Sequence, residues 1–245
     1  MSTTIMPVLF FVIAMLYATV GFGGGSGYLA VMALLRLSPE LMRPTALALN
    51  VLVSAIGSYK FYRAGHFSHR LFWPIAAASI PMAFLGGRLS LPSAAYKPIV
   101  GIILLYAALR LLPRGKQNPD DLQPQRRIPL WLSIAAGAII GLLSGLVGVG
   151  GGIFLSPILL LTGMASTRQT MSISAAFILV NSLAGLAGLV TGDSALPPQL
   201  PVWLAAVAAG GWIGAEYGSR HVDPNRLRRI LVFVLALGGL RMIFS

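Results

Sequence analysis

Long apolar stretches separated by short polar segments follow one another along the chain. Those without an internal break cover roughly residues 41–60, 70–88, 94–112, 170–190, 201–219 and 226–243. A helix needs about 17–25 mostly apolar residues to cross the hydrocarbon layer of a bilayer, and each stretch meets that length. The pattern therefore predicts an all-α integral membrane protein.

Two further apolar stretches are interrupted by glycine. Residues 5–37 contain the block GFGGGSG, which starts at Gly21, and a related block, GVGGG, starts at Gly148. A shift of 127 residues superposes the glycines of the first block on those of the second: Gly21, Gly23, Gly24 and Gly25 on Gly148, Gly150, Gly151 and Gly152. Chance similarity between apolar stretches explains this match poorly. We therefore predict two repeats, residues 1–112 and 130–245, joined by a polar cytoplasmic linker at residues 113–129.

The distribution of basic residues favours an inverted relation between the repeats. If each glycine-broken stretch is a re-entrant, V-shaped helix pair, each repeat adds three transmembrane helices and the second repeat is inverted. Of the 18 Lys and Arg residues, those left outside are then Arg36, Arg43, Arg88, Lys97 and Arg241. A parallel arrangement would place the basic segment 220–229 outside, against the tendency of cytoplasmic loops to be positive. Both termini are expected outside.

Glycine breaks at membrane depth point to a binding site. Backbone groups that a break leaves unpaired are tolerated only beside protein or a water-filled cavity. A helix that restarts after a break presents free N–H groups and a partial positive charge at its N-terminus. We expect the two restarted helices to bind one anion near the midplane of the membrane. The candidate ligands are Gly23, Gly24, Gly25, Ser26, Asn50, Ser54, Gly150, Gly151, Gly152 and Asn181.

Close helix packing is the alternative role for glycine in membranes, and it stays open for both blocks. We assign packing to two other sets, in which glycine recurs every four residues: Gly137, Gly141 and Gly145, and Gly210, Gly214 and Gly218. Among the polar candidates, Asn50 and Asn181 stand out because an amide needs several hydrogen-bond partners. A buried Ser or Thr more often bonds to its own helix backbone.

Composition excludes several other functions. Charged residues make up only 10% of the chain and the mean hydropathy is +0.82, whereas soluble domains are about 25% charged. The net charge of +12 comes from basic residues spread over loops, which is unlike the patch of a nucleic-acid-binding protein. Cysteine is absent and the three histidines lie in basic loops, so no metal or other cofactor is predicted.

Acidic residues are nearly missing from the predicted spans. Glu216 is the exception, and we interpret it as one half of an interface ion pair with an arginine such as Arg220, four residues on. Carboxylates inside a membrane usually mark cation or proton paths, so their scarcity favours an anion. No Lys or Arg falls in the middle of a predicted span, and Arg88 is the nearest exception. We therefore expect neutral dipoles to bind the substrate.

The blocks "GFGGGSGY" and "GLVGVGGGIFLSPILLL", each placed after the first apolar stretch of its half, resemble those of the sulfite exporter TauE/SafE family, also called the TSUP permeases. The resemblance covers nearly the whole chain. It implies a permease of the bacterial inner (plasma) membrane for a small sulfur-containing anion, such as sulfite or a sulfonate. The second block departs from the first, with Ile153 and Phe154 where the first has Ser26 and Gly27. A symmetric pair of sites is therefore not expected.

Two alternatives stay open at this point. One is a permease for a non-sulfur organic anion. The other is a membrane-embedded enzyme, for which the segment HFSH at residues 66–69 offers two histidines, fewer than the four ligands usual in a structural metal site. The predicted partners are a small anionic substrate and the lipid bilayer, without nucleic acid, and a homodimer is an open alternative to a monomer.

Overall fold

The computed structural model describes residues 2–111, 129–191 and 196–220, together with residues 232, 236, 239–240 and 242–244. These parts of the chain are helical and contain no strand, which confirms the all-α class. Before the linker the helices are α1 (Ser2–Ala18), α2 (Gly25–Leu34), α3 (Pro39–Arg63), α4 (His69–Arg88) and α5 (Ser93–Leu111). After it they are α6 (Leu130–Val147), α7 (Gly152–Leu161), α8 (Thr167–Val190) and α9 (Leu200–Arg220).

Membrane-spanning length is present in three of these helices. Within the described residues, Pro39–Arg63, Leu130–Val147 and Arg168–Val190 are long and apolar enough to cross a bilayer. Shorter apolar helices include Ile5–Ala18 and Gly25–Leu34, on either side of the first glycine block. The predicted linker, apart from Pro129, and most of the predicted span 226–243 lie outside the described residues.

Local sequence explains where the long helices begin. Proline occupies the first position of α3, Pro39, where the missing N–H costs no hydrogen bond. A capping box opens α8, because the Ser166 side chain accepts from the Gln169 N–H and the Gln169 side chain accepts from the Ser166 N–H. Glycine, in contrast, determines where α1 and α6 stop.

Helices from opposite sides of the linker pair closely. α1 packs along α9, α4 packs along α6, and α3 packs against α8 in the centre. The two outer pairs are in backbone contact, because a methyl group added at any glycine of the four-residue sets would overlap a carbonyl oxygen of the facing helix. Gly137, Gly141 and Gly145 face Ile75, Ser79 and Ala83, and Gly210, Gly214 and Gly218 face Phe11, Met15 and Thr19. The predicted packing role of these glycines is confirmed.

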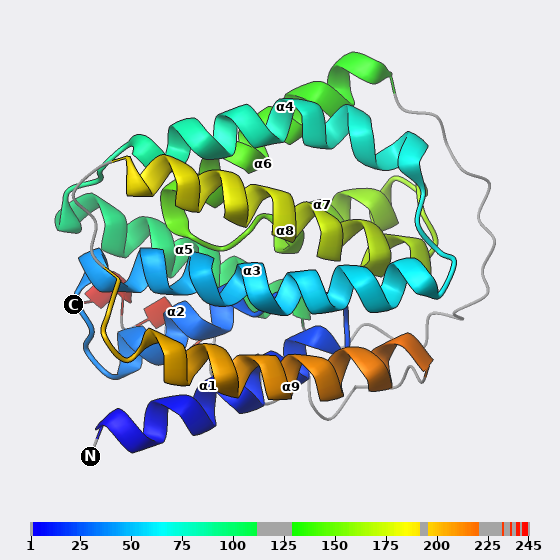
Figure 1. The fold of residues 1–245 in the computed structure, drawn as a ribbon. Helices are drawn as coiled ribbons and strands as arrows, with labels where there is room; N and C mark the ends of the chain where they lie inside the picture. The colour runs from blue at the N-terminus through cyan, green and yellow to red at the C-terminus, as the bar shows by residue number, and fades with distance from the viewer. Residues whose placement is uncertain are drawn as a thin grey trace.

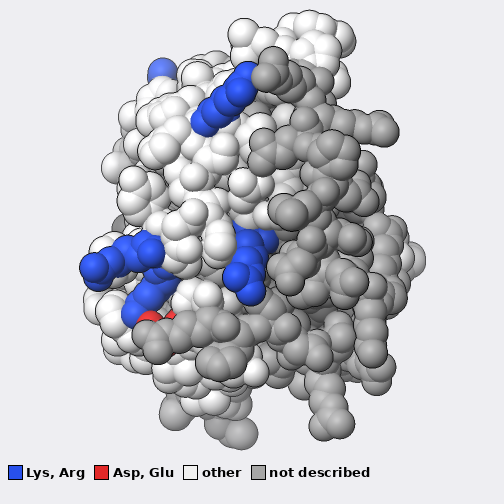
Figure 2. All heavy atoms as spheres, turned by 90° about the vertical axis from the view of Figure 1, so that its right-hand side faces the viewer, with Lys and Arg blue, Asp and Glu red and all other residues white. Residues whose placement is uncertain are grey.

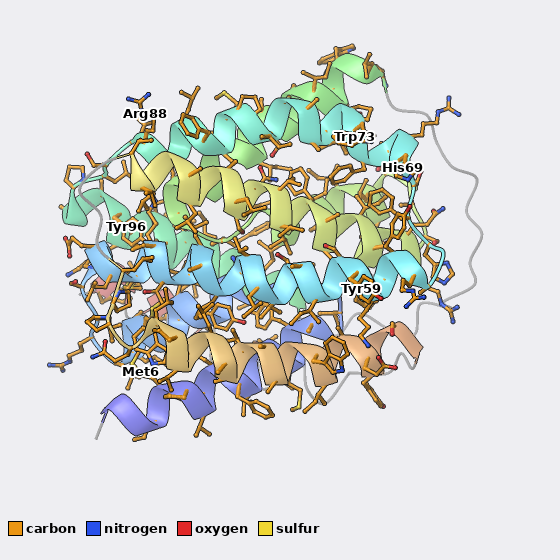
Figure 3. The ribbon with its side chains drawn as sticks, in the orientation of Figure 1. Met6, Tyr59, His69, Trp73, Arg88 and Tyr96 are labelled. Carbon is orange, nitrogen blue, oxygen red and sulfur yellow. The ribbon has the colours of Figure 1, made fainter. Side chains whose placement is uncertain are left out.

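The long helices lie side by side, and equivalent helices run in opposite directions (Figure 1). In that view α3 and α9 run from left to right, whereas α4 and α8 run from right to left. His69 and Arg88, at the two ends of α4, consequently lie at opposite ends of the molecule, and the exposed Arg88 side chain points away from the helices (Figure 3).

Candidate functional site

Both glycine blocks end one helix and begin another, as the sequence predicts. α1 ends at Ala18 and α2 begins at Gly25, after Gly24 with φ 96°. α6 ends at Val147 and α7 begins at Gly152, after Gly151 with φ 82°. Both φ values lie in the left-handed region, which only glycine adopts without strain. The conformation of the chain therefore requires glycine at these two positions.

Each break packs against a helix from the other side of the linker. A methyl group added at Gly21 would lie 2.6 Å from the carbonyl oxygen of Met171, near the start of α8. A methyl group added at Gly148 would lie 3.2 Å from the carbonyl oxygen of Arg43, near the start of α3. The two breaks thus make reciprocal contacts with the two central helices.

Asn50, on α3, touches both breaks. Its side chain is fully buried, and its Nδ2 donates to the Gly148 carbonyl oxygen at 3.4 Å. A methyl group at Gly23 would lie 2.7 Å from Asn50 Oδ1, and one at Gly25 would overlap Nδ2. One at Gly150 would lie 3.1 Å from Nδ2. The structure therefore brings the two predicted glycine blocks together around this predicted ligand.

α8 supplies the opposite side of the meeting point. Ile178 Cγ2 would lie 3.0 Å from a methyl group at Gly23 and 2.7 Å from one at Gly150. Ser182 Oγ would lie 3.0 Å from the methyl group at Gly150, and Ser182 is fully buried. The sequence analysis missed Ser182. Its spacing of four residues from Ile178 and eight from Ser174, on one helix face, is the signal that identifies it.

Among the residues that the structure describes, no side chain caps the N-termini of the helices that restart after the breaks. The first backbone bond of α2 is donated by the Tyr28 N–H to the Gly24 carbonyl at 2.9 Å. In α7 the N–H groups of Phe154 and Leu155 both reach the Gly151 carbonyl, each at 3.1 Å. The amides before these positions precede the hydrogen-bond ladder of their own helix. Their partial positive charge favours an anion at the meeting point.

The other predicted ligands have protein partners. Ser26 Oγ and Tyr17 Oη are 2.9 Å apart and hydrogen-bonded, and the Ser54 hydroxyl donates to the Asn50 carbonyl of its own helix. Asn181 Nδ2 donates to the Phe177 carbonyl at 2.8 Å, and Asn181 Oδ1 accepts from the Ser79 hydroxyl at 2.5 Å. The Asn181 side chain therefore links α8 to α4 through its hydrogen bond with Ser79.

The three remaining predicted glycines face large aromatic or aliphatic side chains. A methyl group at Gly24 would lie 2.6 Å from the Tyr28 ring, and one at Gly151 would lie 2.9 Å from the Phe177 ring. One at Gly152 would overlap Ile178 and lie 3.6 Å from the Phe22 ring, which belongs to the first break. These positions shape the walls of the meeting point through their small size.

Arg43 is a buried cation that the sequence analysis placed among the outside basic residues. It lies within α3 and is 8% exposed. Its Nε donates to the Gly145 carbonyl at 2.9 Å, its Nη1 to Leu89 at 2.8 Å and its Nη2 to Gly87 at 2.7 Å, and Nη2 also bonds to the Gly86 carbonyl. Arg43 therefore caps the C-terminal carbonyls of α4 and α6, where the helix dipoles favour a cation.

Glu216 forms the predicted interface ion pair, with Lys60 of α3 as its partner. The Lys60 ammonium also lies 3.9 Å from the centroid of the Trp212 ring. The side chain of Arg220, the partner that the spacing suggests, lies outside the described residues. The Lys60–Glu216 ion pair links α3 to α9 near the C-terminal end of α3, where Arg63 lies.

The histidine segment packs against aromatic rings. His69 lies edge-on to Phe67, with ring centroids 4.8 Å apart, and 6.2 Å from the centroid of Tyr62. Over the ranges that the structure describes, no group of three His, Cys, Asp or Glu residues is placed to hold a metal ion.

Comparisons with known proteins match this chain over nearly its whole length. The family model described as Sulfite exporter TauE/SafE matches residues 6–242. A probable membrane transporter protein of Sinorhizobium fredii is 42% identical over 240 residues, which cover 98% of this chain and 97% of that protein. Probable membrane transporter proteins of Methanocaldococcus jannaschii and Bacillus subtilis are 25% and 22% identical, over 81% and 96% of this chain and 77% and 97% of those proteins. No solved structure matches the chain.

Proposed function

We propose that this chain, which belongs to the sulfite exporter TauE/SafE family, carries a small sulfur-containing anion, such as sulfite or a sulfonate, across the bacterial inner membrane. The chain is a multi-pass membrane transporter, and the names of its family and relatives indicate a transporter rather than an enzyme.

The observation that carries the proposal is the convergence of both glycine breaks on Asn50. Helix α2 begins at Gly25 beside this amide, and the amide also contacts Gly148 and Gly150, which lie just before α7. The N–H groups at the N-termini of these helices carry a partial positive charge, which can attract an anion without a charged side chain. An anion held by such dipoles is released more easily than one held in an ion pair, which suits a transporter. The nearest buried cation, Arg43, has its guanidinium directed at helix carbonyls.

The proposed architecture is a pair of inverted repeats. The opposite directions of α3 and α8 support it, as do those of α4 and α9 (Figure 1). The exchange of partners supports it as well, because α1 pairs with α9 and α6 pairs with α4. Under the 127-residue shift these two pairs are equivalent, which is the relation expected of repeats that share an axis in the membrane plane.

The positions of the basic side chains indicate which end of the molecule faces the cytoplasm. Figure 2 shows Lys and Arg side chains gathered on the right-hand end of Figure 1. The end of α3, with Lys60 and Arg63, lies there beside the starts of α4, with Arg70, and α8, with Arg168. Cytoplasmic segments of membrane proteins are enriched in these residues, so we assign this end to the cytoplasm.

Transport requires the breaks to separate. As they stand, a single added methyl group at Gly23 or Gly150 would collide with Asn50 or Ile178. The backbone-packed pairs α1–α9 and α4–α6 are suited to move as rigid bodies. We propose that rocking of one pair against the other opens the meeting point to one side of the membrane and then to the other.

A ligand screen tests the proposed function. The purified full chain is heated with sulfite, methanesulfonate, thiosulfate, acetate or succinate, and its melting temperature is recorded. A sulfur oxyanion that raises the melting temperature, and that is then carried into proteoliposomes, is the expected result, because binding to the folded state stabilises it. Stabilisation by the carboxylates alone would support the permease for a non-sulfur anion instead.

Labelling of single cysteines tests the inverted architecture. The chain contains no cysteine, so Ser194→Cys and Ser219→Cys each introduce one site. A membrane-impermeant maleimide should label Ser194→Cys from outside and Ser219→Cys only from the cytoplasm. Labelling of both from the same side would contradict the inversion.

A further inference from the structure

Three buried polar atoms beside the glycines of the breaks have no hydrogen-bond partner in the described part of the chain. They are Asn50 Oδ1 on α3, Ser182 Oγ on α8 and Tyr28 Oη on α2, which lies against Gly24, and all three residues are fully buried. Asn50 Oδ1 and Ser182 Oγ lie on either side of Ile178: a methyl group at Gly23 would lie 2.7 Å from Asn50 Oδ1 and 3.0 Å from Ile178 Cγ2, and one at Gly150 would lie 3.0 Å from Ser182 Oγ and 2.7 Å from Ile178 Cγ2. Unpartnered buried groups are costly, so the pair points to a ligand that satisfies them.

The neighbours of Asn50 determine which way its amide points. Nδ2 faces the carbonyl oxygens of the second break, since it donates to Gly148 and shares with the Val149 carbonyl the space beside Gly25. Oδ1 faces Gly23 of the first break. An amide oxygen accepts hydrogen bonds and cannot donate them. A ligand that satisfies Oδ1 must therefore bring its own N–H or O–H group.

We infer that the transported anion carries a hydrogen-bond donor, so that the site selects a singly protonated oxyanion such as hydrogen sulfite over anions without an O–H, such as sulfonates, sulfinates and sulfate. The inference rests on the proposed function. The O–H of the anion donates to Asn50 Oδ1. Its other oxygens accept from the amides that begin α2 and α7, and from the Ser182 hydroxyl.

Asn50 is then the residue that determines specificity. An anion without an O–H would turn an oxygen or an apolar group toward Oδ1 and would leave that acceptor unpartnered. Sites built to hydrogen-bond a ligand hydroxyl reject analogues that lack it far more strongly than apolar pockets reject a misfit. The open amides of α2 and α7 by themselves would accept any small anion, so discrimination falls to the amide oxygen.

Two ligands of matched charge and shape test the inference. Hydrogen sulfite and methanesulfinate are both monoanions with a pyramidal sulfur, and they differ by a hydroxyl in one where the other has a methyl group. Their dissociation constants are measured by calorimetry on the purified full chain at one mildly acidic pH. Wild-type protein is expected to bind hydrogen sulfite about tenfold tighter or more, because methanesulfinate would leave the buried Asn50 Oδ1 without a hydrogen bond.

Two variants test whether Asn50 causes the preference for hydrogen sulfite. Asn50→Leu, of similar size, should bring the ratio of the two dissociation constants close to one. Ser156→Ala is the matched control and should keep the wild-type ratio, since the Ser156 hydroxyl already bonds to the Gly152 carbonyl at 2.9 Å and to Ser174 Oγ at 2.8 Å.

Equal affinities for the two anions in wild-type protein would overturn the inference while leaving the proposed function in place, and this comparison needs no variant to fold. A wild-type preference that survives in Asn50→Leu would overturn the role of Asn50. If no sulfur oxyanion binds at all, the proposed function fails, and the inference fails with it.

Discussion

The two glycine breaks share a backbone pattern but differ in what holds them. The end of α1 is capped locally: the N–H groups of Gly21 and Phe22 turn back to the carbonyls of Ala18 and Tyr17 at 3.2 and 3.0 Å. The end of α6 also has a local bond, from the Gly148 N–H to the Ser144 carbonyl at 2.8 Å, but side chains from across the linker cap it as well. There Arg43 binds the Gly145 carbonyl and the Tyr96 hydroxyl donates to the Val147 carbonyl at 3.1 Å.

The two breaks also differ in their polar side chains. The first break contains Ser26, hydrogen-bonded to Tyr17, and the second has Ile153 at the equivalent position. Asn50 has Phe177 as its equivalent under the 127-residue shift. The backbone breaks are therefore duplicated, while the polar side-chain contacts at the two breaks differ.

Replacing a glycine in either break should have the largest effect and should be equal for both. Gly24→Leu and Gly151→Leu each force a side chain into the left-handed region, at a cost of about 1–2 kcal/mol, and each would collide with an aromatic ring, Tyr28 or Phe177. Both variants are expected to abolish transport in proteoliposomes while the protein is still inserted in the membrane. Normal transport by both variants would show that the glycines of the breaks serve only close helix packing.

Removing the cap of the second break should affect stability more than binding. Arg43→Gln loses bonds to the carbonyls of Gly145, Gly86 and Gly87, and each hydrogen bond to a charged group is worth about 1.5–3 kcal/mol. The melting temperature should fall by about 10 °C or more, with little change in the dissociation constant of the anion. Thr170→Ala is the matched control, because Thr170 is the equivalent residue beside the first break. A folded Arg43→Gln protein that no longer binds anion would place the arginine at the substrate.

Removing the hydroxyl of the first break should have the smallest effect of the three. Ser26→Ala leaves the buried Tyr17 hydroxyl without its bond to Ser26, and an unsatisfied buried group costs about 1–3 kcal/mol. A modest drop in melting temperature with weaker anion binding of tenfold or less is expected. Complete loss of binding in Ser26→Ala would show that the first break dominates the site.

The helices and their breaks could be predicted from the sequence because both depend on local chemistry. The stretch predicted at 41–60 is α3, Pro39–Arg63, and that predicted at 201–219 is α9, Leu200–Arg220. Apolar length sets these bounds to within three residues. The glycine blocks were equally visible, since adjacent glycines are unfavourable inside a helix.

Contacts between distant helices could not be predicted in the same way. Arg43 bonds to backbone carbonyls of α4 and α6, and no side-chain pattern in a single sequence marks which carbonyls are free. Asn181 looked equivalent in kind to Asn50, but its amide is taken up by Ser79 of α4. Ser182 escaped notice because a lone buried serine usually bonds to its own helix, and here it does not among the described residues.

The most direct test of the convergence on Asn50 is the affinity of Gly23→Ala for sulfite. The φ of Gly23 is not in the left-handed region, so the added methyl group brings no backbone strain, but it would lie 2.7 Å from Asn50 Oδ1 and 3.0 Å from Ile178 Cγ2. Gly57→Ala, also near α8, is the control, because within the described part of the chain the one atom near its methyl group is Ala175 Cβ, at 3.7 Å. Calorimetry should show sulfite binding lost in Gly23→Ala and unchanged in Gly57→Ala. A Gly23→Ala protein that binds sulfite as wild type does would contradict an anion site at the meeting point of the two breaks.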